Sequence, residues 1–206
     1  MRQILFRDRE ILLRKIHVIA AVIIIIVLVM TVSPGAGEQY RHQRTGILFP
    51  DTINTLKLVR ATDYEPLYAG LGTGISYRTE TMRADIFLYD LKQGPVPEGA
   101  SSPVIAREFD QALSDILALE KQGTYKNISV IIKKETVPVG RLKFIHSVLT
   151  YEQNNIKLIS HLYVKGCRGL FMKLRITYFT NARETEEINR AAFLSKIDDM
   201  TRDPSK

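Results

Sequence analysis

An unbroken apolar stretch near the N-terminus precedes the alternating and helical patterns that fill the rest of the chain. From Ile16 to Gly37 no side chain carries a fixed charge, and residues 18–32 read VIAAVIIIIVLVMTV. About 20 apolar residues cross a bilayer core as a helix, because a helix satisfies its own backbone polar groups there. The pattern predicts a transmembrane signal anchor over 16–37. A cleavable signal peptide is the alternative, since the small residues 35–37 resemble a cleavage site.

The flanks of this stretch predict its orientation. Residues 1–15 place apolar side chains on one helical face and charged side chains largely elsewhere, which predicts a cytoplasmic amphipathic segment. Five basic residues precede the apolar stretch, whereas Arg41 and Arg44 follow it together with Glu38. The excess of positive charge on the N-terminal side predicts that this side stays in the cytoplasm. We therefore expect a single-pass protein of the bacterial inner (cytoplasmic) membrane, with its domain on the periplasmic or extracellular side.

Alternating apolar and polar positions predict strands on either side of a central helix. Residues 38–49 read as a polar linker that leads into the fold. Turn-forming residues separate the later strands by short connections, which favour antiparallel pairing. The expected strands cover about 54–59, 70–78 and 82–91 before the helix, and 127–133, 141–151, 156–164 and 169–178 after it.

Two segments show helical periodicity. Ser102 suits an N-cap and Pro103 suits the first helical position, and the helix ends near Gly123. A closing helix follows the last strand, where Asn181 and Glu184 have the spacing of a capping box. The inner face of the first helix consists of Ile105, Phe109, Ala112, Leu113, Ile116 and Leu117.

The order of these elements predicts the fold class. Three strands, a helix, four strands and a helix indicate an α+β domain over 50–198, followed by a polar tail over 199–206. We expect an antiparallel β-sheet of about six to seven strands packed with two helices. A doubly wound nucleotide-binding fold is not predicted, because the strands do not alternate with helices.

Composition and charge exclude several classes of function. The formal net charge is +7, but the sequence has no long basic run and no interleaving of basic and aromatic residues, so nucleic acid is not an expected partner. Cys167 is the one cysteine, so the chain has no internal disulfide, no zinc knuckle and no CxxC motif. Arg168 beside it could lower the thiol pKa, but no base or orienting partner is evident. We expect no cofactor and no metal.

Two histidines are the strongest candidates for chemistry. His146 and His161 lie on neighbouring predicted strands and could share a metal, or one could act as a base with a carboxylate. Whether they share a face depends on a register that strand phase alone does not fix. The carboxylates Asp85, Asp90 and Glu152 are scattered along the chain, with no pairing evident. An envelope hydrolase-like enzyme that uses His146 or His161 is therefore kept as an alternative function.

Glycines and exposed aromatic residues suggest two further possibilities. The segment 70–74 (GLGTG) superficially resembles a phosphate loop, but it leads into a strand rather than a helix, so we interpret it as a turn. Strand phase also suggests an apolar and basic binding face, and the alternative is that a helix covers it. This possible binding face consists of Phe87, Tyr89, Tyr163, Phe171, Lys173 and Arg175.

Three segments carry a resemblance to other proteins. YEPLYAGLGTGISYR, ADIFLYDLKQGPVPEGASSPVIAREFDQALSDI and SHLYVKGCRGLFMKLRITY, in this order, resemble an uncharacterised group of exported or membrane-tethered bacterial proteins, over most of 64–180. The resemblance implies a bacterial origin and export, and it implies no functional residue. The order of strands and helices is also similar to the PsbP/Mog1-like sandwich, an architecture found mostly in binding or assembly factors.

Together these observations predict a non-catalytic, membrane-tethered envelope protein. We expect it to be a binding or assembly module that faces the periplasm or exterior, with an envelope protein as its possible partner and the membrane contacted through the N-terminal helix. A soluble exported ligand-binding domain is the alternative if the N-terminal segment is cleaved.

Overall fold

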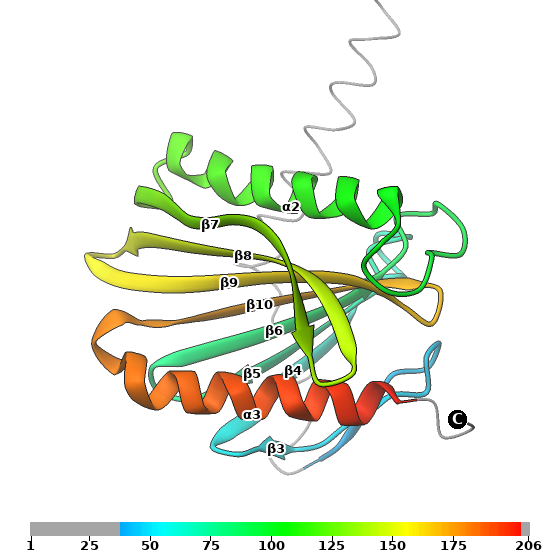
Figure 1. Ribbon diagram of the computed structural model, residues 1–206. Helices are drawn as coiled ribbons and strands as arrows, with labels where there is room; N and C mark the ends of the chain where they lie inside the picture. The colour runs from blue at the N-terminus through cyan, green and yellow to red at the C-terminus, as the bar shows by residue number, and fades with distance from the viewer. Residues whose placement is uncertain (1–37, 203–206) are drawn as a thin grey trace, which may run out of the picture. The chain divides into compact units, whose positions relative to one another are not determined.

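One eight-stranded antiparallel sheet organises the domain. The computed structural model describes residues 38–202, and Figure 1 shows the sheet between its two helices. The predicted segments 1–15 and 16–37 lie outside the described residues, as do residues 203–206 of the predicted tail, whereas residues 199–201 of that tail are helical. Within 38–202, neither helix has the length and apolar character needed to span a bilayer. In spatial order the strands are β3 (Thr52–Ile53), β4 (Leu56–Asp63), β5 (Thr73–Arg78), β6 (Met82–Tyr89), β10 (Leu170–Phe179), β9 (Ile156–Cys167), β8 (Leu142–Gln153) and β7 (Lys126–Val139).

The structure confirms the α+β class and the order of the seven predicted strands and two helices. The sheet has eight strands rather than six to seven, because the short strand β3 pairs with the start of β4. The prediction of a polar linker over 38–49 is wrong. A small hairpin forms there, in which β1 (Tyr40–Arg41) pairs with β2 (Leu48–Phe49). Phe49 is fully buried, so the hairpin joins the apolar core and is part of the domain.

The helices begin for different reasons. Helix α2 (Pro103–Lys121) begins as predicted, and the Ser102 hydroxyl accepts a hydrogen bond from the Val104 backbone N–H at 3.2 Å. Helix α3 (Arg183–Thr201) follows a 3₁₀ turn over Thr180–Ala182. The capping box predicted at Asn181 and Glu184 is absent, because this turn moves the N-cap to Ala182, whose side chain cannot cap.

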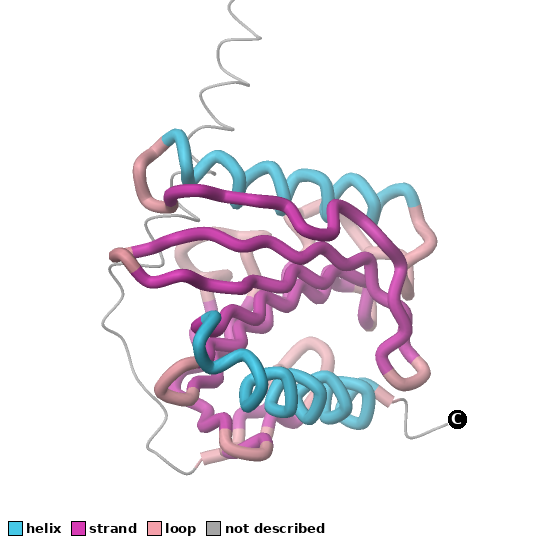
Figure 2. Tube along the Cα trace, turned by 60° about the vertical axis from the view of Figure 1, so that its left-hand side comes forward, coloured by secondary structure: helices cyan, strands magenta, loops and turns pink. Residues whose placement is uncertain are grey.

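The two helices lie on opposite faces of the sheet (Figures 1 and 2). Helix α2 contacts β7, β8 and β9, whereas α3 contacts β10, β3 and β7. Successive side chains of a strand point to opposite faces, so the strands β6 to β10 contribute to two separate apolar clusters, whereas β3, β4 and β5 contribute only to the one on the face of α3. On β10, for example, Leu174 packs into the cluster around Phe193 of α3, while Phe171 packs into the cluster around Phe109 of α2. We refer to these faces as the α2 side and the α3 side.

Candidate functional site

The sheet divides the binding face that the sequence predicts. Tyr163 lies directly opposite Leu174 and therefore on the α3 side, so the prediction that it shares this face is wrong. Val164, the next residue of β9, lies opposite Lys173 instead. The residues of β9 that share a face with Lys173 are therefore shifted by one position from those that strand phase suggested. The residues that do share the α2 side are Phe87, Tyr89, Phe171, Lys173 and Arg175.

Helix α2 covers the aromatic end of this set. Tyr89 and Phe171 are buried, with ring centroids 5.4 Å apart, and the Tyr89 hydroxyl donates to Glu108 Oε1 of α2 at 2.5 Å. Lys173 lies over the rings of Phe87 and Tyr89, with its Nζ 5.2 Å and 5.0 Å from their centroids. Burial lowers the pKa of Lys173, and the charge of Glu108 opposes that shift. These aromatic residues are therefore part of the core, as the alternative interpretation supposed.

Beyond α2 the same side of the sheet carries rows of cations. Lys57, Arg78 and Arg83 lie directly opposite one another on β4, β5 and β6. The next row places Arg60 opposite Ser76, Ser76 opposite Asp85, and Asp85 opposite Arg175. Neighbouring strands lie about 4.8 Å apart, so the cations of a row are closely spaced. We call this surface the open face and define it by Lys57, Arg60, Ser76, Arg78, Arg83, Asp85, Lys173 and Arg175.

The positive charge of the open face is poorly balanced. Its carboxylate, Asp85, is buried and already bonded, since the Ser76 hydroxyl donates to it at 2.5 Å and Arg83 Nε lies 2.5 Å away. Lys57, Arg60 and Arg78 are exposed, and none forms an ion pair with another described residue. Like charges directly opposite on a sheet destabilise it. An anionic group on this face would remove that repulsion.

Arg175 is held in a defined position at the boundary between the open face and α2. Its guanidinium carbon lies 5.7 Å and 5.8 Å from the ring centroids of Tyr125 and Tyr151. Its Nε donates to Ser160 Oγ at 2.9 Å, and its Nη2 donates to the Tyr151 hydroxyl at 3.3 Å. Burial raises the pKa of Tyr125 to about 12, so the phenol stays neutral beside the guanidinium. Packing and hydrogen bonds thus fix this cation before any ligand arrives.

On the α3 side the two candidate histidines meet. His146 and His161 are both buried, and His146 Nε2 lies 3.1 Å from His161 Nδ1. His146 Nδ1 lies 2.9 Å from Glu135 Oε1 of β7, and His161 Nε2 lies 3.0 Å from the Tyr178 hydroxyl. Burial lowers the pKa of His161 to about 3, so this imidazole is neutral at ordinary pH. All four ring nitrogens therefore already have partners within the protein.

The contacts continue from Tyr178 to α3. The Tyr178 hydroxyl donates to Glu187, and Arg190 donates from Nε to the other Glu187 oxygen at 2.9 Å. Arg190 also donates from Nη1 to the Tyr163 hydroxyl at 2.7 Å. The carboxylates next to the histidines are thus Glu135 and Glu187, and not Asp85, Asp90 or Glu152. We call Glu135, His146, His161, Tyr178 and Glu187 the buried chain.

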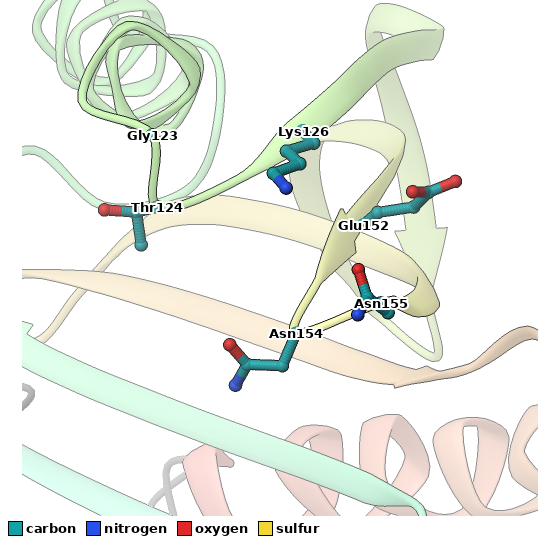
Figure 3. A pocket seen from close by; sticks show the side chains of 6 residues that line it. All are labelled: Gly123, Thr124, Lys126, Glu152, Asn154 and Asn155. Carbon is teal, nitrogen blue, oxygen red and sulfur yellow. The ribbon is translucent and has the colours of Figure 1, made fainter.

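A shallow hollow of about 280 Å³ lies elsewhere, between the end of α2 and the β8–β9 turn (Figure 3). Asn154 and Asn155 lie in the turn and both have positive φ, so their presence there is explained by backbone conformation. Neither histidine of the buried chain lines the hollow. Between residues 38 and 202, no group of three or more histidine, cysteine, aspartate and glutamate side chains is arranged to hold a metal ion. The lining residues are Gly123, Thr124, Lys126, Glu152, Asn154 and Asn155.

The glycine-rich segment is a structural turn, as the sequence indicates. The Glu65 carboxylate accepts hydrogen bonds from the backbone N–H groups of Gly70 and Gly72, at 3.0 Å and 2.9 Å. A carboxylate therefore occupies the amides that a phosphate would need. Gly72 has φ +61°, and a Cβ at that position would lie 1.8 Å from the Leu88 carbonyl oxygen, so the tight approach of two chain segments requires glycine.

Cys167 is buried at the end of β9. Burial raises the pKa of its thiol, although Lys165 nearby acts in the opposite direction. A buried, protonated thiol is a poor nucleophile, so the geometry does not favour catalysis by this residue.

Comparisons with known proteins add a likeness of overall shape. No protein-family model matches the sequence, and no curated protein matches it. Among solved structures, the solution structure of cyanobacterial PsbP (CyanoP) from Synechocystis sp. PCC 6803 is similar, with a TM-score of 0.45 and 12% sequence identity. The match covers 81% of this chain and 96% of that protein. The likeness amounts to a weak analogy of architecture.

Proposed function

We propose that this protein is a non-catalytic, membrane-tethered binding or assembly module whose open face binds an acidic segment of an envelope protein. The observation that carries the proposal is the row of Lys57, Arg78 and Arg83, which lie directly opposite one another and in which Lys57 and Arg78 have no carboxylate partner among the described residues, whereas Arg83 pairs with Asp85. Such a row costs stability in the isolated domain. An acidic partner would offset that cost, so charge complementarity favours a carboxylate-rich occupant.

The side chains of the open face favour a protein partner over a lipid surface. Most of its cations are arginines, and a guanidinium pairs with a carboxylate through two parallel hydrogen bonds. Arg175 is already positioned by Tyr125 and Tyr151, which reduces the entropy lost on binding. Surfaces that enter the membrane interface combine basic groups with large apolar side chains. The residues that define the open face instead carry guanidinium, ammonium, hydroxyl and carboxylate groups.

The buried chain supports the non-catalytic part of the proposal. A general base must reach a substrate proton with a free ring nitrogen. In His146 and His161 every ring nitrogen lies within hydrogen-bonding distance of another side chain of the protein. Both rings are also buried, and neither lines the hollow at the β8–β9 turn. The arrangement is that of a structural network rather than an open acid–base site.

The tether and the periplasmic placement are further parts of the proposal. They rest on the apolar stretch 16–37, on the basic residues before it, and on the resemblance to exported or membrane-tethered bacterial proteins. We expect the chain to resist alkaline carbonate extraction from membranes and to keep its first 37 residues. A mature chain that begins near Glu38 and is released by carbonate would instead identify a soluble exported domain.

The binding proposal is tested by crosslinking in native membranes. A photoreactive residue at Ser76 reports contacts at the centre of the open face, in the otherwise unchanged chain and in the double variant Arg60→Glu/Arg78→Glu. Lys133→Glu/Lys143→Glu is the matched control, because it makes the same change in net charge at exposed positions outside the open face. We expect the open-face variant to lose the crosslinked protein by about tenfold or more, and the control to keep it. Crosslinks to lipid alone, or equal crosslinking in both variants, would reject an acidic protein partner on this face.

A further inference from the structure

The buried chain is one hydrogen atom short of completing its hydrogen bonds. Four contacts join its five side chains: Glu135 to His146, His146 to His161, His161 to Tyr178, and Tyr178 to Glu187. Each contact needs one hydrogen. With both carboxylates ionised, two neutral imidazoles and one phenol supply only three. One of the four contacts must therefore either bring two acceptors together or hold an additional proton.

Arg190 determines which of the four contacts lacks a hydrogen. Its Nε and Nη2 donate to Glu187 Oε2 at 2.9 Å and 2.5 Å, which stabilises the ionised carboxylate. Burial acts in the opposite direction, but the hydrogen bonds from Arg190 and Tyr178 lower the pKa of Glu187. Glu187 is therefore an acceptor, and the Tyr178 hydroxyl must give its hydrogen to it. The Tyr178 oxygen then accepts from His161 Nε2–H.

The tautomers of both rings follow from this direction. A neutral His161 that carries its hydrogen on Nε2 offers Nδ1 as an acceptor, so His146 must donate from Nε2–H. The distance of 3.7 Å from His161 Nε2 to Glu187 Oε1 is consistent with this tautomer of His161, because a hydrogen on Nε2 is attracted to the carboxylate and a lone pair would be repelled. His146 Nδ1 is left without a hydrogen, yet it lies 2.9 Å from Glu135 Oε1. The missing hydrogen belongs at this contact.

We propose that the contact between Glu135 and His146 is a proton-binding site, at which one proton taken up from solvent completes the hydrogen bonds that connect edge strand β7 to helix α3. The Glu135 side chain is 43% exposed, so the proton enters and leaves through this carboxylate without passing the core. No other bond forms or breaks. When the proton leaves, a carboxylate oxygen faces the Nδ1 lone pair, and the two repel.

Strand β7 is built to respond to this change locally. Its pairing with β8 shifts register between Ile132 and Glu135, so the ladder is already irregular where Glu135 projects toward His146. Bulges of this kind redirect a side chain and weaken the local pairing. We therefore expect proton release to loosen β7 near Glu135 and to leave α3 in place.

The neighbours of His146 determine the pH range. Burial lowers the pKa of His146, and the hydrogen bond and charge of Glu135 oppose that effect. Uptake is therefore expected below the ordinary histidine pKa of about 6.5. The titratable and charged groups that face the two imidazoles come from every element packed against them, and they are Glu135 of β7, Tyr163 of β9, Tyr178 of β10, and Arg183, Glu187 and Arg190 of α3.

Nitrogen NMR of the full-length chain, labelled with ¹⁵N-histidine in detergent micelles, tests the proposal. At about pH 8 both His146 and His161 should be Nε2–H tautomers, and as the pH falls below about 6.5 His146 Nδ1 should gain a proton while His161 stays neutral. An Nδ1–H tautomer on either ring at pH 8, or protonation of His161 before His146, would overturn it. These readings need only the unaltered chain.

The variant Glu135→Gln sharpens the test. Its amide can donate to His146 Nδ1 and so supplies the missing hydrogen without a proton. We expect the His146 midpoint to fall by more than about one pH unit, whereas the exposed control Glu184→Gln should leave it unchanged. The same midpoint in Glu135→Gln as in the unaltered chain would overturn the proposal.

Discussion

Polar side chains are buried and hydrogen-bonded on one face of the sheet, and several are exposed and unpaired among the described residues on the other. On the α3 side, His146, His161 and Tyr178 are buried, and each lies within hydrogen-bonding distance of a partner. On the α2 side, beyond the helix, Lys57, Arg60 and Arg78 are exposed and form no ion pair with the described residues. Buried polar groups require partners because an unsatisfied one costs free energy, whereas solvated cations do not.

From this difference we expect one face to act mainly in folding and the other mainly in binding. The α3 side connects β7, β8, β9, β10 and α3 through one continuous set of contacts, so changes there should act on folding. The exposed cations of the open face, Lys57, Arg60 and Arg78, form no ion pair with the described residues, and like charges oppose one another across the strands. Changes there should act on binding. Substitutions and pH can therefore test the assignment one face at a time.

The largest expected effect comes from removing His161. His161→Ala takes away a ring in the middle of the buried chain, so His146 Nε2 and Tyr178 lose a partner and a cavity forms. We expect the free energy of unfolding of the full-length chain in detergent to fall by about 3 kcal/mol. Arg60→Ala on the open face is the control and should change it by less than about 0.5 kcal/mol. Denaturant titration measures both.

A second outcome of this substitution bears on the enzyme alternative. Because we assign His161 a structural role, cellular defects of His161→Ala should follow the loss of folded protein. A variant with unchanged abundance and melting temperature that nevertheless loses cellular function would contradict the assignment and restore the hydrolase-like interpretation.

Acid should destabilise the protein through the same residue. Burial lowers the pKa of His161 from 6.5 to about 3 in the folded state. Below pH 6.5 the unfolded chain takes up a proton that folded His161 does not, so the stabilisation present above pH 6.5 is lost as the pH falls toward 3. Between pH 6.5 and about pH 5 this amounts to about 2 kcal/mol. Denaturation midpoints should decrease over that range, and His161→Ala should reduce the decrease; a flat or rising profile would contradict the neutral, buried imidazole.

The sequence predicts the secondary-structure elements better than it predicts which residues share a face of the sheet. Alternation and helical spacing locate the seven main strands and both helices, because those patterns are local. The assignment of Tyr163 to the binding face failed because a strand's phase identifies two faces but not which of them meets a given neighbour. The pairing of His146 with His161 could not be predicted for the same reason, since it depends on the register between β8 and β9.

The predicted binding face included two cations of the open face, Lys173 and Arg175, but not Lys57, Arg60, Arg78 and Arg83. Lys57 and Arg60 fall in or beside a predicted strand, but they are three residues apart and would point to opposite faces of a regular strand. The register shift between Leu58 and Arg60 brings both to the α2 side. A bulge of this kind leaves no clear pattern in a single sequence, so the row with Arg78 and Arg83 becomes visible only in the structure.

The smallest expected effect concerns Arg78, and it tests whether the exposed cations of the open face contribute to the stability of the fold. Partial burial, followed by the positive charge of Arg83, lowers the pKa of Arg78, although Asp85 acts in the opposite direction. Arg78→Gln should therefore leave the free energy of unfolding within about 0.5 kcal/mol, with any change toward stabilisation. That gain should disappear in high salt, because salt screens repulsion between exposed charges. A decrease of more than about 1 kcal/mol in the free energy of unfolding would instead show that Arg78 supports the fold. The distinction between a structural face and a binding face would then be wrong.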